Sequence, residues 1–147
     1  MSRAPAKTLL ALLVLPLLAC ATGPATDLES LAGDWQVREV YCRSCASVTR
    51  TDIGTVVHIR HDAIDNPLAG GRCPGRVAFR PVPATPALRG ESLAKLDPRW
   101  VGDQGAAVRW LAVTCDNLDF TRLIRLPDGS LAYTDDGELA YRLARQR

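Results

Sequence analysis

The clearest structural signal in the chain lies in residues 107–145, AVRWLAVTCDNLDFTRLIRLPDGSLAYTDDGELAYRLAR, where short turn sequences separate apolar segments. The turns fall at Asp116-Asn117, Pro127-Asp128-Gly129 and Asp135-Asp136-Gly137. Asn, Asp, Pro and Gly favour tight turns, and turns at this close spacing are typical of linked β-hairpins. The sequence therefore predicts an antiparallel meander with strands at Ala107–Thr114, Asp119–Leu126, Ser130–Thr134 and Glu138–Arg145.

Three earlier segments continue this pattern. Thr55–Arg60 (TVVHIR) is rich in the β-branched residues that favour half-buried strands, and Arg76–Val82 (RVAFRPV) is a second such segment. A first strand begins near Gly33, where alternating positions are held by Val37, Glu39 and Tyr41. We therefore expect an all-β domain of about seven antiparallel strands.

Gly33 and Trp35 form a Gly-x-Trp motif that resembles the first-strand signature of lipocalin-like barrels. In that family a short helical turn precedes the Gly, and the Trp closes one end of the barrel. The resemblance implies a small, lipocalin-like up-and-down β-barrel, closed or nearly closed. An ordinary core Trp on a first strand would give the same motif. By strand alternation Glu39 lies on the same face as Trp35, where a buried carboxylate would need an Arg partner.

Lipocalin-like barrels also often set an Arg of the last strand against this Trp, which implies that Arg142 packs on Trp35 at the barrel end. Arg142 lies on the face opposite Leu139 and Tyr141, and a cation–π contact there would contribute ~0.5–2 kcal/mol. The alternative is that Arg142 is exposed on the polar face. Arg145 is the other arginine of this strand.

The second fold that the pattern allows is an open curved antiparallel sheet with one short helix, as in small secreted META-type domains. The helix would lie at Glu91–Leu96, which is long enough for about one and a half turns.

This segment belongs to Pro81–Gly105, which is rich in Pro and Gly and poor in large apolar residues. Long loops in compact domains are usually functional or disordered. We expect either a lid over the barrel mouth or an insertion without packed structure.

An export signal precedes the predicted domain. Arg3 and Lys7 give a basic start, and Leu9–Cys20 (LLALLVLPLLAC) is apolar but too short to span ~30 Å of hydrocarbon. Its ending, Leu17-Leu18-Ala19-Cys20, resembles the lipobox of bacterial lipoproteins. The resemblance implies cleavage before Cys20 and a thioether-linked diacylglycerol on this cysteine. The alternative is an ordinary signal peptide that ends near a cysteine.

The resulting division is a lipoprotein signal peptide at 1–19, a lipidated Cys with a flexible tether at 20–30, and the β-barrel domain at 31–147. The tether contains Ala21–Thr26 (ATGPAT), whose small and polar residues are typical of flexible linkers. In lipoproteins of diderm bacteria, Asp after the lipidated Cys favours retention in the inner membrane. Ala21 at this position therefore implies anchoring to the outer membrane, on its periplasmic face.

Charge argues against a nucleic-acid partner. Loss of Arg3 and Lys7 with the signal leaves 16 of the 18 Lys and Arg residues against 16 Asp and Glu. Binding to nucleic acid needs a concentrated basic surface, which a neutral chain does not predict.

Four cysteines remain after Cys20, an even number that points to disulfides in an exported chain. In a simple up-and-down meander Cys42 and Cys45 follow the first strand at one end, and Cys73 precedes the Arg76–Val82 strand at the other. If the Trp110 strand comes next, Cys115 ends beside Cys73. With one extra strand between them, Cys73 would have no partner. Only the first arrangement pairs every thiol, as Cys73–Cys115 and Cys42–Cys45.

The Cys42-Arg43-Ser44-Cys45 spacing also allows a redox or metal interpretation. A low thiol pKa usually needs a helix N-terminus, which is not expected here, and a four-Cys zinc site would prefer a second close pair. His58 and His61 are the only histidines and would point to opposite faces of a strand, so they do not predict a shared metal site. We find no Ser-His-Asp order, phosphate loop or HExxH motif. No catalytic residue, metal ligand or cofactor is assigned.

Two functional classes follow from these expectations. The first is a non-catalytic binding module that holds a small apolar ligand or envelope component inside the barrel. The second is an envelope protein-interaction or hydrolase-inhibitor domain that acts through its loops. An interior filled by Trp35, Tyr41, Phe79, Trp110 and Phe120 would favour the second class.

Overall fold

The computed structural model describes residues 28–47, 51–135 and 137–147. In chain order the elements are α1 (Leu28–Leu31), β1 (Gly33–Cys42), β2 (Val56–Ile59), β3 (Ile64–Asn66), η1 (Pro67–Ala69), β4 (Gly71–Arg72), β5 (Val77–Val82), α2 (Pro86–Lys95), α3 (Pro98–Val101), η2 (Gly105–Ala107), β6 (Arg109–Cys115), β7 (Leu118–Arg125), β8 (Leu131–Thr134) and β9 (Leu139–Arg145). The elements η1 and η2 are short 3-10 helices.

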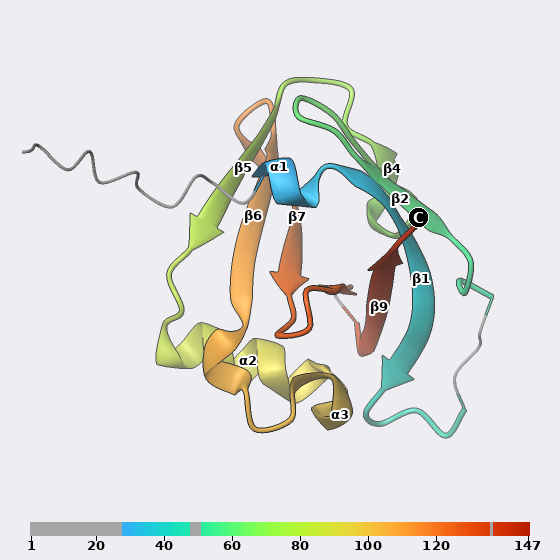
Figure 1. The fold of residues 1–147 in the computed structure, drawn as a ribbon, viewed down its shortest axis with the longest axis vertical. Helices are drawn as coiled ribbons and strands as arrows, with labels where there is room; N and C mark the ends of the chain where they lie inside the picture. The colour runs from blue at the N-terminus through green and yellow to red at the C-terminus, as the bar shows by residue number, and fades with distance from the viewer. Residues whose placement is uncertain (1–27, 48–50, 136) are drawn as a thin grey trace, which may run out of the picture.

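The strands form one sheet in the order β4-β3-β2-β1-β9-β8-β7-β6-β5, with antiparallel pairs throughout. Consecutive strands are neighbours except at β4 and β5, and the first strand pairs with the last. The sheet is therefore an up-and-down meander that curls on itself and stays open between β4 and β5 (Figure 1). Nine strands of a meander cannot close into a wholly antiparallel ring, because an odd number leaves one neighbouring pair parallel.

The prediction of an all-β antiparallel fold is confirmed, in the open, curved form and not as a closed barrel. Two of the nine strands, β3 and β4, were outside the predicted seven. They have three and two residues, which is too short for an alternating pattern to be recognised.

A disulfide bridges the open side of the sheet. Cys73, directly after β4, is joined to Cys115 at the end of β6, with the Cα atoms 5.8 Å apart. Beside this bond the Asp116 carboxylate accepts a hydrogen bond from the Arg76 amide at 2.8 Å. A Cβ at Gly75 would lie 1.9 Å from Oδ2 of Asp116, so a larger residue here would displace this carboxylate. The disulfide therefore ties the strand at one edge of the sheet, β4, to the β5–β6 pair at the other edge.

The free edge of β5 is protected against further strand pairing. The Asp116 amide donates to the Arg76 carbonyl, which makes these two residues a hydrogen-bonded pair of the β5–β6 ladder. In an antiparallel ladder every second residue forms such a pair, so the even-numbered residues after Arg76 form the backbone hydrogen bonds to β6. The backbone groups of Val77, Phe79 and Pro81 therefore point to the open edge. Pro81 has no N–H to offer there, and proline at an edge strand limits edge-to-edge association.

One apolar cluster fills the inner face of the curved sheet. It draws on α1 and on strands from both sides of the sheet, and most of its members are less than a tenth exposed. The buried members are Leu31, Trp35, Val37, Val57, Ile59, Ile64, Cys73, Val77, Leu111, Val113, Leu123, Leu131, Tyr133, Tyr141 and Leu143. Phe79 and Phe120 pack against them as partly buried residues. Large side chains therefore occupy the inner face.

A second apolar cluster lies on the opposite face, where α2 and α3 cover the strands. Trp110, Ile124, Ala132 and Ala140 alternate with inner-face residues along β6 to β9, and Leu96 and Trp100 pack on them from the helical side. The remaining buried members are Val108 and Leu126, with Tyr41, Val82, Leu88, Leu93 and Val101 at the margin. The two helices form a second layer below β6 and β7 in Figure 1.

The expectation that Pro81–Gly105 is an unpacked insertion was wrong, because this segment packs on the strands through Leu96 and Trp100. The alternative, a lid over the barrel mouth, stays a prediction. The helix α2 in this segment runs from Pro86 to Lys95 and is longer than the predicted Glu91–Leu96. The Thr85 side chain caps it by accepting from the Leu88 amide at 3.2 Å, and Pro86 stands at the first helical position, where it needs no amide partner.

Candidate functional site

Trp35 is fixed at the end of the inner cluster by α1 and by β9. Its indole Nε1 donates to the Leu31 carbonyl at 2.8 Å. The Arg145 guanidinium carbon lies 5.0 Å from the centre of the Trp35 ring, and the two residues are direct partners across the β1–β9 ladder. A short helix therefore precedes Gly33, and Trp35 is buried against it.

The prediction that Arg142 packs on Trp35 was wrong, because the strand register gives this position to Arg145. Arg142 is instead the cross-strand partner of Glu39. Three positions separate the two arginines on β9, so their side chains lie on opposite faces of the strand. Arg145 therefore reaches the inner face, and Arg142 the face that α3 covers.

A bulge in β1 brings Glu39 to Arg142. The ladder between β1 and β9 shifts between Val37 and Glu39, which leaves Arg38 as the extra residue. The shift moves Glu39 to the face opposite Trp35, so the predicted common face was wrong. The expected Arg partner is confirmed, since Arg142 Nη1 donates to Glu39 Oε1 at 2.7 Å.

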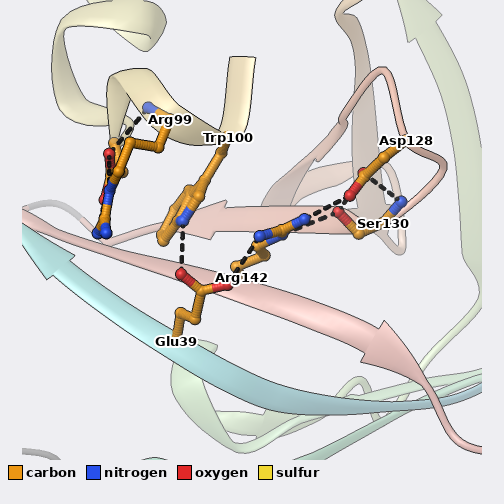
Figure 2. Close-up of polar contacts among 7 residues, drawn as sticks. Glu39, Arg99, Trp100, Asp128, Ser130 and Arg142 are labelled. Carbon is orange, nitrogen blue, oxygen red and sulfur yellow. Dashed lines mark hydrogen bonds and ion pairs between the residues drawn. The ribbon is translucent and has the colours of Figure 1, made fainter. Parts of the chain in front are cut away.

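Figure 2 shows Trp100 and Arg142 approaching Glu39 from two sides. The Trp100 indole donates to Glu39 Oε2 at 3.0 Å. The other nitrogens of Arg142 reach the β7–β8 turn, where Nη2 donates to Asp128 and Nε donates to Ser130 Oγ at 3.3 Å. Ser130 Oγ in turn donates to Asp128 Oδ1 at 2.6 Å. The guanidinium thus links β1, β9 and the β7–β8 turn.

The ionisation of this network is favoured by its own contacts. Partial burial would lower the pKa of the Arg142 guanidinium, but the carboxylates of Asp128 and Glu39 together raise it above the usual value. Burial would raise the pKa of Asp128, but hydrogen bonds from Ser130 and Arg142 hold it below the usual value. Arg142 is therefore a charged group whose charge two acids balance.

Figure 2 also shows a second ion pair, at the start of α3. Asp97 is 3% exposed, and its Oδ1 accepts the Arg99 amide at 2.9 Å while both oxygens accept from the Arg99 guanidinium. The side-chain bonds to Arg99 hold the pKa of Asp97 below its usual value despite burial. This pair caps α3 and stabilises the helix that presents Trp100.

An open cleft of about 620 Å³ lies where α1, the β1 bulge, the β7–β8 turn and the end of β9 meet. Among its described lining residues are four arginines and two carboxylates: Arg38, Arg125, Arg142, Arg145, Glu39 and Asp128. Arg125 Nη1 donates to Ser30 Oγ at 2.6 Å, and Arg145 Nη2 donates to the Ser30 carbonyl. Two guanidiniums thus converge on Ser30 at this part of the cleft.

Sequence reasoning did not single out Arg38 or Arg125. Their positions on strands resemble those of ordinary exposed arginines, and only the bulge and the placement of α1 bring them to one cleft. The neighbouring signal, an Arg on the last strand near a first-strand Trp, did point to this end of the molecule.

The cysteines form Cys42–Cys45 and Cys73–Cys115, the pairs that the meander predicts. Figure 1 shows β1 ending at the bottom near α3 and the β6–β7 turn at the top, so the two bridges lie at opposite ends. Glu138 lies close enough to Cys42 and Cys45 for the three to form a potential ligand set. The disulfide ties up both sulfurs, however, and metal ligation requires thiolates. Cys20 lies outside the described residues.

The two histidines lie away from the cleft. His58 Nδ1 is 2.9 Å from Asp34 Oδ1, and Arg60 Nη2 donates to the same oxygen at 2.7 Å. These hydrogen bonds, from His58 first and then from Arg60, hold the pKa of Asp34 below its usual value. This is a surface ion-pair cluster on β1 and β2.

None of the helices within residues 28–47, 51–135 and 137–147 combines the length and the apolar character needed to cross a membrane. Comparison of the chain with protein-family models, with curated proteins and with solved structures found no match.

Proposed function

We propose that this protein is a lipid-anchored, non-catalytic interaction domain on the periplasmic face of the outer membrane, which binds an acidic envelope partner through its surface. The observation that carries this proposal is the packed inner face. Trp35, Tyr133 and Tyr141 lie there among aliphatic residues at 8% exposure or less. An open cleft of about 740 Å³ does reach the inner cluster at Leu68, Phe120 and Tyr133, but most of its other lining residues are polar or charged. A binding module for a small apolar ligand would instead need an apolar cavity of ~300–1,000 Å³.

The arginine-lined cleft supports the choice of an acidic partner. Arg142 is balanced by Glu39 and Asp128, whereas Arg145 contacts the Trp35 ring and a carbonyl group. Guanidinium groups bind carboxylate and phosphate through two parallel hydrogen bonds. An acidic group of a partner would find such donors at this cleft.

The anchor is tested by mass spectrometry of the native protein with three variants. We expect a diacylglyceryl-modified N-terminal Cys20, no acylation in Cys20→Ser, and unchanged acylation in the control Ala21→Ser. Ala21→Asp should remain acylated but move to the inner-membrane fraction. An unmodified Cys20 in the mature native protein would contradict the anchor, and an unchanged location of Ala21→Asp would contradict the outer-membrane assignment.

The mode of binding is tested with the neutral fluorescent probe N-phenyl-1-naphthylamine. We expect no saturable fluorescence increase when the folded protein is titrated with the probe, because aromatic and aliphatic side chains fill the inner face. Saturable binding that Leu123→Trp abolishes would favour the apolar-ligand function instead. Leu123 is 0% exposed on the inner face, so the added ring would compete for the same space.

A further inference from the structure

Two arginines of the cleft carry charge that no acid in the described part of the chain balances. Arg38, the extra residue of the β1 bulge, is exposed, and its side chain makes no hydrogen bond or ion pair with the described residues. Arg145 makes its contacts with neutral groups, namely the Trp35 ring and the Ser30 carbonyl. Both line the same cleft, so a bound anion could meet both guanidiniums.

The cleft lies close in sequence to the expected lipid anchor. Ser30 of α1 lines it, and α1 begins at Leu28, eight positions after Cys20. Eight residues span at most ~29 Å when fully extended. An acyl chain on Cys20 therefore holds the cleft near the bilayer surface at a high effective concentration.

The shape of the cleft favours a surface over an enclosed soluble ligand. Pockets for small molecules bury most of their ligand, whereas this cleft is open and two of its arginines, Arg38 and Arg145, are exposed. Each Arg within a Debye length of ~8–10 Å of an anionic leaflet raises membrane affinity about fivefold. A guanidinium also matches the paired oxygens of a phosphate group.

We propose that this cleft docks onto the phosphate headgroups of anionic phospholipid in the leaflet that carries the anchor. The inference rests on the proposed function, because the acyl anchor on Cys20 is what brings the cleft to the bilayer. Docking would orient the folded domain with α1 and the end of β9 towards the lipid and with α2 and α3 away from it.

The test separates the cleft from the anchor. The mature chain from position 20 with Cys20→Ser keeps every described element and carries no acyl chain. Its binding to phosphatidylcholine vesicles with and without phosphatidylglycerol is measured by co-sedimentation at roughly 0.05 M and 0.5 M salt. We expect binding only to the phosphatidylglycerol vesicles, with loss of that binding at high salt.

Arg38→Gln should weaken this binding about fivefold without changing the melting temperature, because the Arg38 side chain is exposed and has no hydrogen bond or ion pair with the described residues. Arg80→Gln is the matched control, since Arg80 is also an exposed strand arginine, on β5, and does not line the cleft. It should leave vesicle binding within about twofold of the parent, because its charge lies away from the docking face. Inorganic phosphate should compete only at millimolar concentration.

Equal binding to both vesicle types, or equal loss in Arg38→Gln and Arg80→Gln, would overturn the proposal. Micromolar binding of inorganic phosphate would also overturn it, since the ligand would then be a soluble phosphate. The state of Cys20 in the native protein reports the anchor independently. An acylated Cys20 with no preference for phosphatidylglycerol would therefore refute headgroup docking and leave the anchored interaction domain intact.

Discussion

The two faces of the sheet are buried in different ways. The inner face is covered by the sheet itself, because the curl brings residues of β2 and β3 against those of β6 and β7, and α1 closes one end. The opposite face is covered by α2 and α3, which come from one segment between β5 and β6. The inner core thus depends on contacts across the whole chain, and the outer core depends on one local addition.

This difference separates global from local stability. Loss of a side chain in a core built from long-range contacts destabilises the whole fold, whereas loss of a contact under a small helical layer can release that layer alone. The cleft lies at the boundary between the two cores, because it joins the Trp35 end of the inner face to the Glu39–Arg142 pair of the outer face.

The largest effect is expected for Trp35→Ala. Trp35 is 3% exposed in the inner core, and removal of such a side chain typically costs about 3–5 kcal/mol. Urea denaturation should show this loss as a single transition, with an unchanged dependence of the unfolding free energy on urea concentration.

Trp100→Ala, on the outer face, is the matched comparison and should lower the free energy of unfolding by less. Hydrogen exchange should show that it releases amides of α2 and α3 while β7 and β8 stay protected. Equal global loss in both variants would contradict the distinction between the faces.

The two disulfides should differ in the same sense. Cys73–Cys115 closes a segment with a sequence separation of 42 and bridges the open side of the sheet, so its loss in Cys73→Ala/Cys115→Ala should cost about 4 kcal/mol. Cys42–Cys45, with a separation of 3, restricts the unfolded chain far less, and its double Ala variant should lose about 1–2 kcal/mol. The midpoints of urea denaturation measure both. A larger loss for the Cys42–Cys45 variant would show that the open side needs no bridge.

Much of the inner face could be predicted from the sequence because strand alternation is a local property. Leu139, Tyr141 and Leu143 occupy alternating positions, and the turn residues between strands fix which segments pair. Asp116 and Asn117 both have positive φ, at 52° and 66°, as a two-residue hairpin turn requires. Alternation of strand direction in the meander likewise predicted that Cys73, before one strand, lies beside Cys115, at the end of the next.

The outer face and the cleft could not be predicted because they depend on features without a local pattern. A bulge adds one residue to β1 and moves Glu39 to the other face, and no residue type in this part of β1 indicates a bulge. The choice of Arg145 over Arg142 for Trp35 follows from the same register. The helical layer was predicted only in part, as one short helix at Glu91–Leu96. Helix α2 contains a proline, a glycine and few large apolar residues, and its stability comes from packing on Trp110 and its neighbours.

A smaller effect is expected for Asp97→Asn, which tests the attachment of the helical layer. The pKa of Asp97 lies below its ordinary value near 3.8 in the folded protein, chiefly because Arg99 donates to it. A carboxyl with a lowered folded pKa stabilises the fold above pH 3.8, and this contribution is lost as the pH falls through the folded pKa. Asp97→Asn should therefore cost about 1–3 kcal/mol at pH 7 and less at pH 3.

The measurement is the urea midpoint of both proteins between pH 2 and 7 (roughly the range of carboxyl titration). Asp97→Glu is the control that keeps the charge but changes the cap geometry, and it should retain the pH dependence. A difference between parent and Asp97→Asn that stays constant with pH would mean that the ionised Asp97–Arg99 pair does not stabilise α3.

The smallest effect is expected for Tyr141→Phe, which tests whether the inner face is dry. Burial, with smaller contributions from Asp52 and Asp135, raises the pKa of Tyr141 to about 12. Because the folded pKa lies above the ordinary value of 10.0, the neutral ring stabilises the fold fully below pH 10 and this contribution disappears as the pH rises through 12.

Absorbance at alkaline pH should show one tyrosine ionising near 12 in the folded protein, and this step should be absent in Tyr141→Phe. At pH 7 the variant loses only the hydrogen bond to Asp52 Oδ2, at 3.3 Å, and about 0.5–1 kcal/mol. If all tyrosines of the folded protein ionise near 10, as in the urea-unfolded chain, water reaches the inner face and a ligand cavity inside the sheet becomes the better account of its function.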